Sequence, residues 1–228
     1  MKLNTILQSL IEAEAKALRL FDLIEERGLI TAGQTEKELN DSIYRLAEEE
    51  LNIRKYWHKR IVRAGENTLF PYKENPPNLD ITDDTILFLD LGPVFNDFEA
   101  DIGRTYVLGE DPRKMALKSS VEEAWFEVND HFWSNEKITA SELYHFCQTL
   151  ASDYGWSFGG EIAGHLVGKF PHERLEDIPK DCYIHAENNL PMHEVRKWKN
   201  SFWIIEIHFV DKDDKIGGFY EQLALRRI

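Results

Sequence analysis

The spacing of apolar residues near the start of the chain predicts an amphipathic helix over residues 3–27, with Gly28 as a typical helix end. A second helix is predicted to begin after Thr35. Thr35 and Glu38 have the spacing of a capping box, in which side chains and backbone at a helix start bond reciprocally. The apolar stripes of the two helices comprise Leu7, Leu10, Ile11, Leu18, Phe21 and Ile24 in the first, and Ile43 and Leu46 in the second.

Strand-like and helix-like segments then follow one another. Residues 60–78 are rich in turn formers, and the prolines at 76 and 77 cannot continue a helix. We expect a β-hairpin from strands at 85–92 and 101–109, helices at 112–133 and 139–155, and strands at 201–211 and 217–226. Thr139 and Glu142 give the later helix its own capping box. This order predicts an α+β fold with a mostly antiparallel sheet.

Composition narrows the class of protein. The 228 residues carry a net charge of -14, which argues against general nucleic-acid binding because that function needs a basic face. The two cysteines, Cys147 and Cys182, are too few for a disulfide framework and fit a reducing, cytoplasmic location. The first 20 residues do not have a signal-peptide pattern, and no apolar run is long enough for a membrane span. We therefore expect a cytoplasmic protein with neither nucleic-acid nor membrane partners.

Four acidic residues lie within apolar segments that are typical of strands. A buried, ionised carboxylate in such a segment needs a partner or a metal ion. The four are Asp90, Asp101, Glu206 and Glu221, and His165 lies between flanking glycines that permit close approach. Carboxylates with one imidazole suit Mn²⁺, Fe²⁺, Co²⁺ or Zn²⁺. Four carboxylates are too many for one catalytic ion, but they suit two ions that share bridging carboxylates.

Simpler interpretations stay open when each residue is taken alone. Asp101 could pair with Arg104, and Glu206 could face solvent on an edge strand with His208 as a surface histidine. The basic segment from His58 to Arg63 could steer a substrate carboxylate, although a solvated strand rim is the favoured interpretation.

Motifs around the five candidate residues resemble those of the pita-bread fold metallopeptidases, which include methionine aminopeptidase, aminopeptidase P, prolidase and creatinase. FLDLG and ADIGRTYVLG, with Asp90 and Asp101, resemble the two aspartate motifs at the family's spacing of eleven residues. GHLVGKFPHE, with His165, resembles the family's GH…HE motif. WIIEIHF and GGFYEQLAL, with Glu206 and Glu221, stand where the family has its two glutamates. The resemblance covers residues 60–224, approximately, and GQTEKEL also resembles a family segment at a helix start.

The resemblance implies a role for each residue. Asp90 would chelate one ion, Asp101 and Glu221 would bridge two ions, and His165 and Glu206 would complete the shell of the second. Glu206 would also be the general base. His172, seven residues after His165, would stabilise the peptide oxygen as the tetrahedral intermediate forms and would thus contact substrate. The cofactor would be two divalent metal ions, with Mn²⁺ preferred over Co²⁺, Fe²⁺ or Zn²⁺.

Some positions depart from the family pattern and leave specificity open. Pro71 stands nearest to the position of a substrate-contacting histidine, and Glu161 replaces a histidine that is frequent in the proline-specific branch. Phe219 stands where aminopeptidase P and prolidase carry an arginine. Trp57 and Tyr72 are candidate substrate-binding residues, because the fold of the family brings their segments near the site.

The resemblance implies a single pita-bread catalytic domain over residues 1–228, with two N-terminal helices at about 3–52 and no separate N-terminal domain. The expected activity is dinuclear metallo-aminopeptidase hydrolysis of the N-terminal residue of a peptide, with Xaa-Pro peptides as one candidate class. A creatinase-like hydrolase of a small C–N substrate and a non-catalytic peptide-binding module are the alternatives. The tendency of the family favours a homodimer.

Overall fold

The computed structural model describes residues 3–70, 72–169, 180–193 and 202–226. Its four α-helices are α1 (Leu3–Glu26), α2 (Glu36–Leu51), α3 (Pro112–Ser134) and α4 (Ala140–Asp153). Both predicted capping boxes are confirmed. The Thr35 hydroxyl accepts from the Glu38 N–H, and the Thr139 hydroxyl accepts from the Glu142 N–H, while each glutamate side chain accepts from the backbone N–H of its threonine. These local bonds explain why the starts of α2 and α4 could be predicted from sequence.

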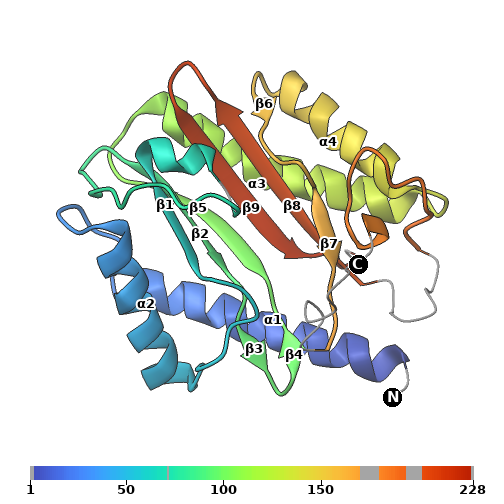
Figure 1. Cartoon of the computed structure of the whole chain (residues 1–228), viewed down its shortest axis with the longest axis horizontal. Coiled ribbons are helices and arrows are strands. Elements are labelled where there is room, and N and C mark those ends of the chain that lie inside the picture. Colours follow the sequence, from blue (N-terminus) through green and yellow to red (C-terminus); the bar gives the residue numbers. More distant parts are fainter. Residues whose placement is uncertain (1–2, 71, 170–179, 194–201, 227–228) are drawn as a thin grey trace.

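An antiparallel sheet runs through the molecule in the order β1-β2-β5-β9-β8-β6, with β7 also paired to β8 (Figure 1). Its strands are β1 (Ile61–Ala64), β2 (Ile86–Leu91), β5 (Ile102–Val107), β6 (Ser157–Phe158), β7 (Gly164–Leu166), β8 (Trp203–Asp211) and β9 (Ile216–Leu223). The predicted hairpin is confirmed as the β2–β5 pair, and its connection contains a small second hairpin of β3 (Val94–Phe95) and β4 (Phe98–Glu99). Short 3₁₀ helices η1 and η2 span Gly65–Leu69 and Lys180–Cys182.

Helices cover one face of this sheet. In Figure 1, α1 and α3 lie behind the strands; α3 contacts β5, β8 and β9, and α1 contacts β4 and β5. Aromatic residues of α3 contribute to the core: Trp125 and Phe132 are buried, and Phe126 and Trp133 pack against the buried cluster. Cys147 is buried on α4. Within the described ranges, no helix has the length and apolarity that crossing a membrane requires.

The sequence-based prediction did not include β1 or β7. β1 has four residues in a segment dominated by turn formers, and β7 has three residues next to glycine. Such short runs carry too little alternation for a periodicity signal. Both strands depend on their neighbours, since β1 pairs with β2 over Ile61–Ala64 and β7 pairs with β8 over Gly164–Leu166.

A buried carboxyl group connects α1 to the sheet. Glu14 is 4% exposed, and its Oε2 accepts a hydrogen bond of 3.0 Å from the backbone N–H of Leu223 at the end of β9. Burial raises the pKa of Glu14 to about 7, although this hydrogen bond and the nearby Gln222 and Arg104 oppose the shift. The folded state therefore favours the neutral carboxyl group.

Replacing Glu14 by glutamine should stabilise the protein at pH 8. Because the pKa is higher in the folded than in the unfolded chain, ionisation costs stability that is absent below pH 4.5 and complete above pH 7. Glu14→Gln removes this cost, and we expect a gain of about 1–3 kcal/mol at pH 8. Thermal melts at pH 4.5 and pH 8 measure it. The matched variant Glu12→Gln, at an exposed position of α1, should change neither melt; an equal gain for Glu14→Gln at both pH values would contradict the assignment.

Candidate metal centre

The register of the sheet places three carboxylates in one row across its centre. Asp90 of β2 lies opposite Gly103 of β5, Gly103 lies opposite Glu221 of β9, and Glu221 lies opposite Glu206 of β8. Directly opposite residues in antiparallel strands point to the same face. Asp90 and Glu221 are 7% and 2% exposed, whereas Glu206 is partly exposed.

A glycine in the middle of this row leaves room for the acids. A Cβ atom on Gly103 would overlap the ring of Phe219 and come within 3.0 Å of the Cβ of Glu221. Any larger residue would therefore push β9 away from β5, because the atoms that it meets are firmly packed. Gly103, the glycine of the predicted GRTYV segment, is thus required for space beside the carboxylate of Glu221.

Asp101 and His165 join the row from the sheet margins. Asp101 directly precedes β5 and is 2% exposed, and its Oδ2 lies 3.1 Å from Nε2 of His165. His165 lies opposite Ile204, two residues before Glu206, and its Nε2 is also 3.9 Å from Oε1 of Glu221. The structure therefore brings together all five residues that the sequence motifs singled out.

The close approach expected beside His165 is confirmed at Gly164. Its φ of +131° is a backbone conformation that L side chains rarely adopt, and a Cβ there would overlap the carbonyl oxygen of Ile204. Glycine lets β7 approach β8 and so places the imidazole of His165 over the carboxylates.

The simpler interpretations of these residues are wrong. Arg104 donates to the backbone oxygens of Gly103 and Glu221, at 2.8 and 2.9 Å, and does not pair with Asp101. β8 lies between β9 on one side and β6 and β7 on the other, so Glu206 is not on an edge strand. His208 is 2% exposed and its Nε2 bonds with the carbonyl oxygen of Thr68, so it is not a surface histidine.

His58 is a component of the site that the sequence analysis did not assign. The favoured interpretation as part of a solvated strand rim is wrong, because the His58 side chain is only 2% exposed. Its Nε2 lies 3.2 Å from Oδ1 of Asp101 and 3.4 Å from Oδ1 of Asp90. It precedes Asp101 by 43 positions and belongs to none of the recognised motifs. In the sequence, His58 stands between Trp57 and Lys59, and this local context does not indicate a metal or substrate site.

The electrostatics of the cluster reflect four carboxylates in close contact. Burial raises the pKa of Asp90 and of Glu206 to about 7, although His58 and His165 respectively oppose these shifts. Burial and the other three acids raise the pKa of Glu221 well above its usual range. Without added positive charge, part of this cluster must therefore hold protons.

The two histidines supply positive charge in the metal-free protein. Burial opposes a charged imidazole, but Asp90 and Asp101 outweigh burial and raise the pKa of His58 to about 9. Burial acts on His165 in the same way, yet its bond to Asp101 helps to raise the pKa to about 9. Burial would raise the pKa of Asp101, but the two imidazoles lower it. Asp101 is thus the acid that stays ionised between two histidines.

These residues fit the binding of divalent metal ions. Asp101, His165 and Glu221 offer donor atoms within 4.8 Å of one another, and so do His58, Asp90 and Asp101. Oδ1 of Asp90 is buried yet makes no hydrogen bond among the described residues. Two ionised glutamates directly opposite each other, as Glu206 and Glu221 are, destabilise a sheet unless a proton or a cation lies between them. Carboxylate and imidazole donors suit several first-row divalent ions.

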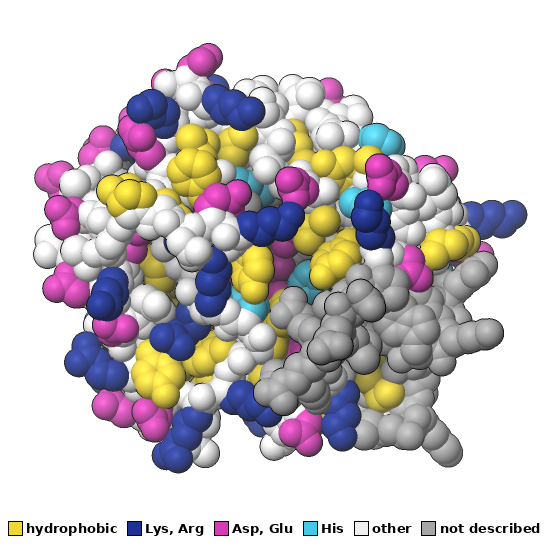
Figure 2. All heavy atoms as spheres, in the orientation of Figure 1, with side chains coloured by type: hydrophobic (Ala, Val, Ile, Leu, Met, Phe, Trp, Pro, Cys, Tyr) yellow, Lys and Arg dark blue, Asp and Glu magenta, His cyan; other side chains and the backbone are white. Residues whose placement is uncertain are grey.

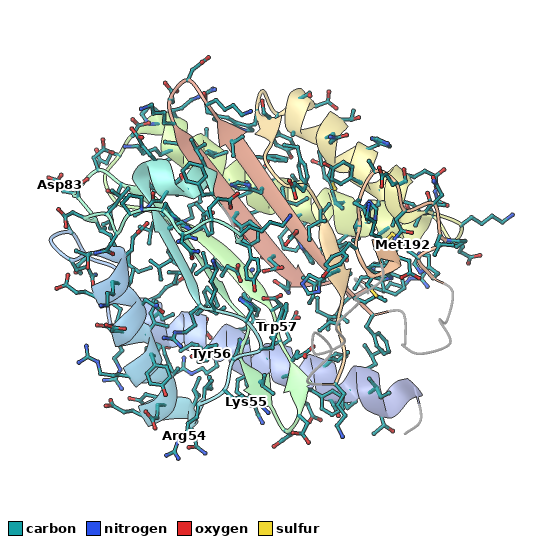
Figure 3. The ribbon with its side chains drawn as sticks, viewed as in Figure 1. Arg54, Lys55, Tyr56, Trp57, Asp83 and Met192 are labelled. Carbon is teal, nitrogen blue, oxygen red and sulfur yellow. The ribbon has the colours of Figure 1, made fainter. Side chains whose placement is uncertain are left out.

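The candidate substrate residues differ in position. The Trp57 ring lies 5.3 Å from that of His165, and its Nε1 donates to the carbonyl oxygen of Ala100, so Trp57 borders the cluster (Figure 3). Tyr72 is 42% exposed, with its ring 5.9 Å from that of His58.

His172 and Pro71 lie outside the described residues. Glu161 is exposed and pairs with Lys73, whereas Phe219 is buried beside Phe88.

The cluster is accessible from the face opposite to α1 and α3. Figure 2 shows acidic and histidine side chains at the bottom of a hollow near the centre of this face.

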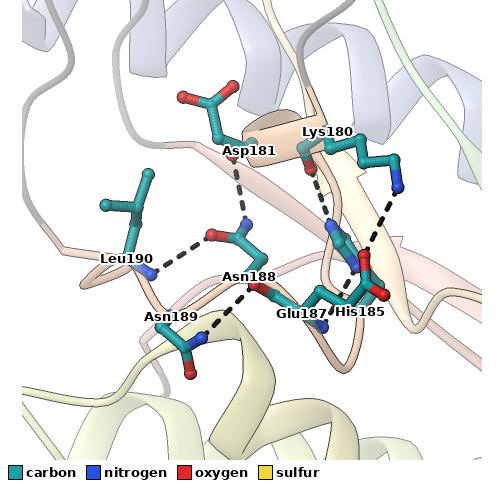
Figure 4. Close-up of a pocket in the computed structure, with 7 residues that line it drawn as sticks. All are labelled: Lys180, Asp181, His185, Glu187, Asn188, Asn189 and Leu190. Carbon is teal, nitrogen blue, oxygen red and sulfur yellow. Dashed lines mark hydrogen bonds and ion pairs between the residues drawn. The ribbon is translucent and has the colours of Figure 1, made fainter.

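A separate pocket of about 380 Å³ lies between Lys180 and Leu190 (Figure 4). Its polar groups bond mainly to one another: Asn188 donates to the backbone oxygens of Asp181 and Tyr183, and the His185 ring bonds to the backbone of Lys180. This pocket contains none of the clustered residues.

Comparison with known proteins gives consistent matches. The model of metallopeptidase family M24 matches residues 8–221. An uncharacterized peptidase of Methanocaldococcus jannaschii is 32% identical over 123 residues, which are 53% of this chain and 34% of that protein. The chain thus spans about a third of the length of this curated relative.

Solved structures share the fold. A prolidase from Thermococcus sibiricus superposes with a TM-score of 0.72 at 22% identity, over 96% of this chain and 57% of that one. A methionine aminopeptidase from Rickettsia prowazekii superposes with a TM-score of 0.71 at 14% identity, over 98% of this chain and 94% of that one. These likenesses bear out the predicted pita-bread architecture.

Divalent cations should stabilise this protein against heat. A ligand that binds only the folded state stabilises it by about 2.7 kcal/mol at a concentration 100 times its dissociation constant. We expect thermal melts to shift upward on addition of Mn²⁺ and to return when a chelator removes the ion. Asp101→Ala should bind at least one ion fewer, measured by elemental analysis, and should show a smaller shift. Full metal content in this variant would contradict the placing of Asp101 at the centre of the cluster.

Proposed function

Because the chain belongs to metallopeptidase family M24, we propose that it is a metal-dependent peptidase that removes the N-terminal residue from peptides. The observation that carries this proposal is the gathering of Asp90, Asp101, His165, Glu206 and Glu221 on one face of the sheet. Such a set of donors supports a mechanism in which bound metal ions activate water for hydrolysis.

In this proposal each residue holds one part of the site. Asp90 would chelate one ion, Asp101 and Glu221 would serve both ions, and His165 and Glu206 would be the remaining ligands of the second ion. Two bound cations would lower the pKa of a bridging water and polarise the scissile carbonyl. Mn²⁺ is the proposed ion, with Co²⁺, Fe²⁺ and Zn²⁺ as candidates that the same donors accept.

Glu206 is the proposed general base. It is the partly exposed member of the carboxylate row, whereas Asp90, Asp101 and Glu221 are all buried. An attacking water can therefore reach it from the hollow. Its carboxylate would accept a proton from that water and pass it on to the leaving amine.

The substrate end of the site includes Trp57, whose ring stacks edge-on to His58 and His165. A free peptide N-terminus would lie near the acidic cluster, because a primary ammonium or amine group is attracted by its carboxylates. His172 is proposed from the family motif to donate to the peptide oxygen. Tyr72, near the rim, is a further candidate contact. Specificity for Xaa-Pro peptides is a further hypothesis. At Glu161 and Phe219 this chain departs from the pattern of the proline-specific enzymes.

A peptide panel tests the function. We expect the metal-loaded protein to release the first residue from some peptides with free N-termini, and N-acetylated copies to remain intact. Xaa-Pro and Xaa-Ala pairs in the panel measure preference, and creatine measures the alternative hydrolase activity. Glu206→Gln should lower kcat by about 10²–10⁴-fold, because the proton acceptor is lost.

The matched control is Glu161→Gln, which removes an exposed acid outside the cluster and should leave kcat unchanged. If the metal-loaded protein releases no residue from any peptide, the peptidase proposal fails. Binding of the same peptides without cleavage would then favour a non-catalytic peptide-binding module.

His172 provides a separate prediction. His172→Ala should retain the full metal content of the unaltered protein but lower kcat by about 10²–10³-fold, as loss of one oxyanion donor does elsewhere. Elemental analysis and steady-state kinetics on the same preparation measure both quantities. Loss of metal from this variant would assign His172 to the metal ligands instead.

A further inference from the structure

We propose that His58 is a sixth metal ligand, which binds the same ion as Asp90, so that each of the two ions has one imidazole. The inference rests on the metal centre proposed above and extends it. His58 belongs to none of the five family motifs, and it enters the cluster from the segment between α2 and β1. Three lines of geometry support it: the orientation of the ring, the distances to the aspartates, and the space made for it.

The ring of His58 is oriented in the same way as that of His165. Nδ1 of His58 lies 2.7 Å from the carbonyl oxygen of Lys59, and Nδ1 of His165 lies 2.9 Å from the carbonyl oxygen of Leu166. A carbonyl oxygen can only accept, so Nδ1 carries the proton in both rings. This is the usual second bond of a metal-binding histidine, since it fixes the tautomer and directs Nε2 toward the acidic cluster.

The lone pair of a neutral His58 then points at two acidic oxygens. Nε2 faces Oδ1 of Asp101 at 3.2 Å and Oδ1 of Asp90 at 3.4 Å. A lone pair directed at two carboxylates is repulsive, so Nε2 carries a proton in the metal-free protein and would exchange that proton for a metal ion on binding. Oδ1 of Asp90 also lacks a hydrogen bond among the described residues, so its lone pairs are available to an ion.

The distances fit three donors around one ion. Metal–donor bonds of about 2.1 Å at tetrahedral to octahedral angles place neighbouring donors about 3.0–3.4 Å apart. The His58 contacts of 3.2 and 3.4 Å lie in this range, as does the 3.1 Å contact between His165 and Asp101. His58 approaches Oδ1 of Asp101, and His165 approaches Oδ2. Asp101 thus offers one oxygen to each half of a nearly symmetric site.

The space for the imidazole is made by Gly92, two residues after Asp90. A Cβ atom on Gly92 would overlap the His58 ring and the indole nitrogen of Trp57. The carbonyl oxygen of the same glycine accepts a hydrogen bond of 2.9 Å from the backbone N–H of Trp57. Gly92 therefore both anchors the segment and admits the ring, which places His58 beside Asp90 in the folded chain.

Replacement of the metals by Co²⁺ gives a direct test that does not depend on activity. In ¹H NMR spectra recorded in water, each histidine bound to Co²⁺ gives one exchangeable, strongly shifted ring N–H resonance. We expect two such resonances from the unaltered protein and one from His58→Ala. The affinity for one of the two Co²⁺ ions, measured by titration, should fall at least about tenfold in this variant.

His145→Ala is the matched control, because His145 lies on the exposed side of α4 and should affect neither resonance. If the unaltered protein binds two Co²⁺ ions but gives a single exchangeable resonance, the assignment of His58 is wrong and the metal centre still stands. This outcome is measured on the unaltered protein and does not depend on the folding of the variant. Absence of Co²⁺ binding altogether would instead overturn the proposed function and this inference with it. If both resonances persist in His58→Ala, His58 is an ion-pair partner of the aspartates and the proposal fails.

Discussion

The repulsion among four neighbouring carboxylates is the constraint around which this fold is arranged. Asp90, Glu221 and Glu206 follow one another across adjacent strands, and Asp101 contacts the histidines beside them. A buried carboxylate is costly, and several together are costlier, so the cluster needs cations or protons to be stable. In this sense the site lowers the stability of the sheet until positive charge is supplied.

The remainder of the structure holds these groups in place. Antiparallel pairing over eight residues of β8 and β9 fixes Glu206 opposite Glu221, and a slip of one residue would turn both side chains to the opposite face. Glycines make the necessary room at Gly103 and Gly92. Glu14 of α1 bonds to the end of β9, two residues after Glu221, which ties the N-terminal helix to the strand that carries a proposed bridging ligand.

Family motifs and tertiary contacts contribute different residues to the site. Asp101 contacts His165 through one oxygen and His58 through the other, yet only His165 belongs to a recognisable motif. The two histidines share the same bond to the backbone carbonyl of the next residue. A second imidazole among the donors would also suit Fe²⁺ or Zn²⁺, which remain candidates beside the proposed Mn²⁺.

The sequence by itself determined the helices with capping boxes, the long strands and the five acidic and histidine candidates, because each of these signals is local. Caps depend on residues three apart, strands on alternation, and the motifs on short fixed spacings. Only the tertiary structure decided the short strands β1 and β7, the burial of His208 and the place of His58, since each depends on a partner distant in the chain. His58 lies 43 positions from Asp101, and no periodicity connects them; they meet because β1 and β2 pair and Gly92 leaves space for the ring.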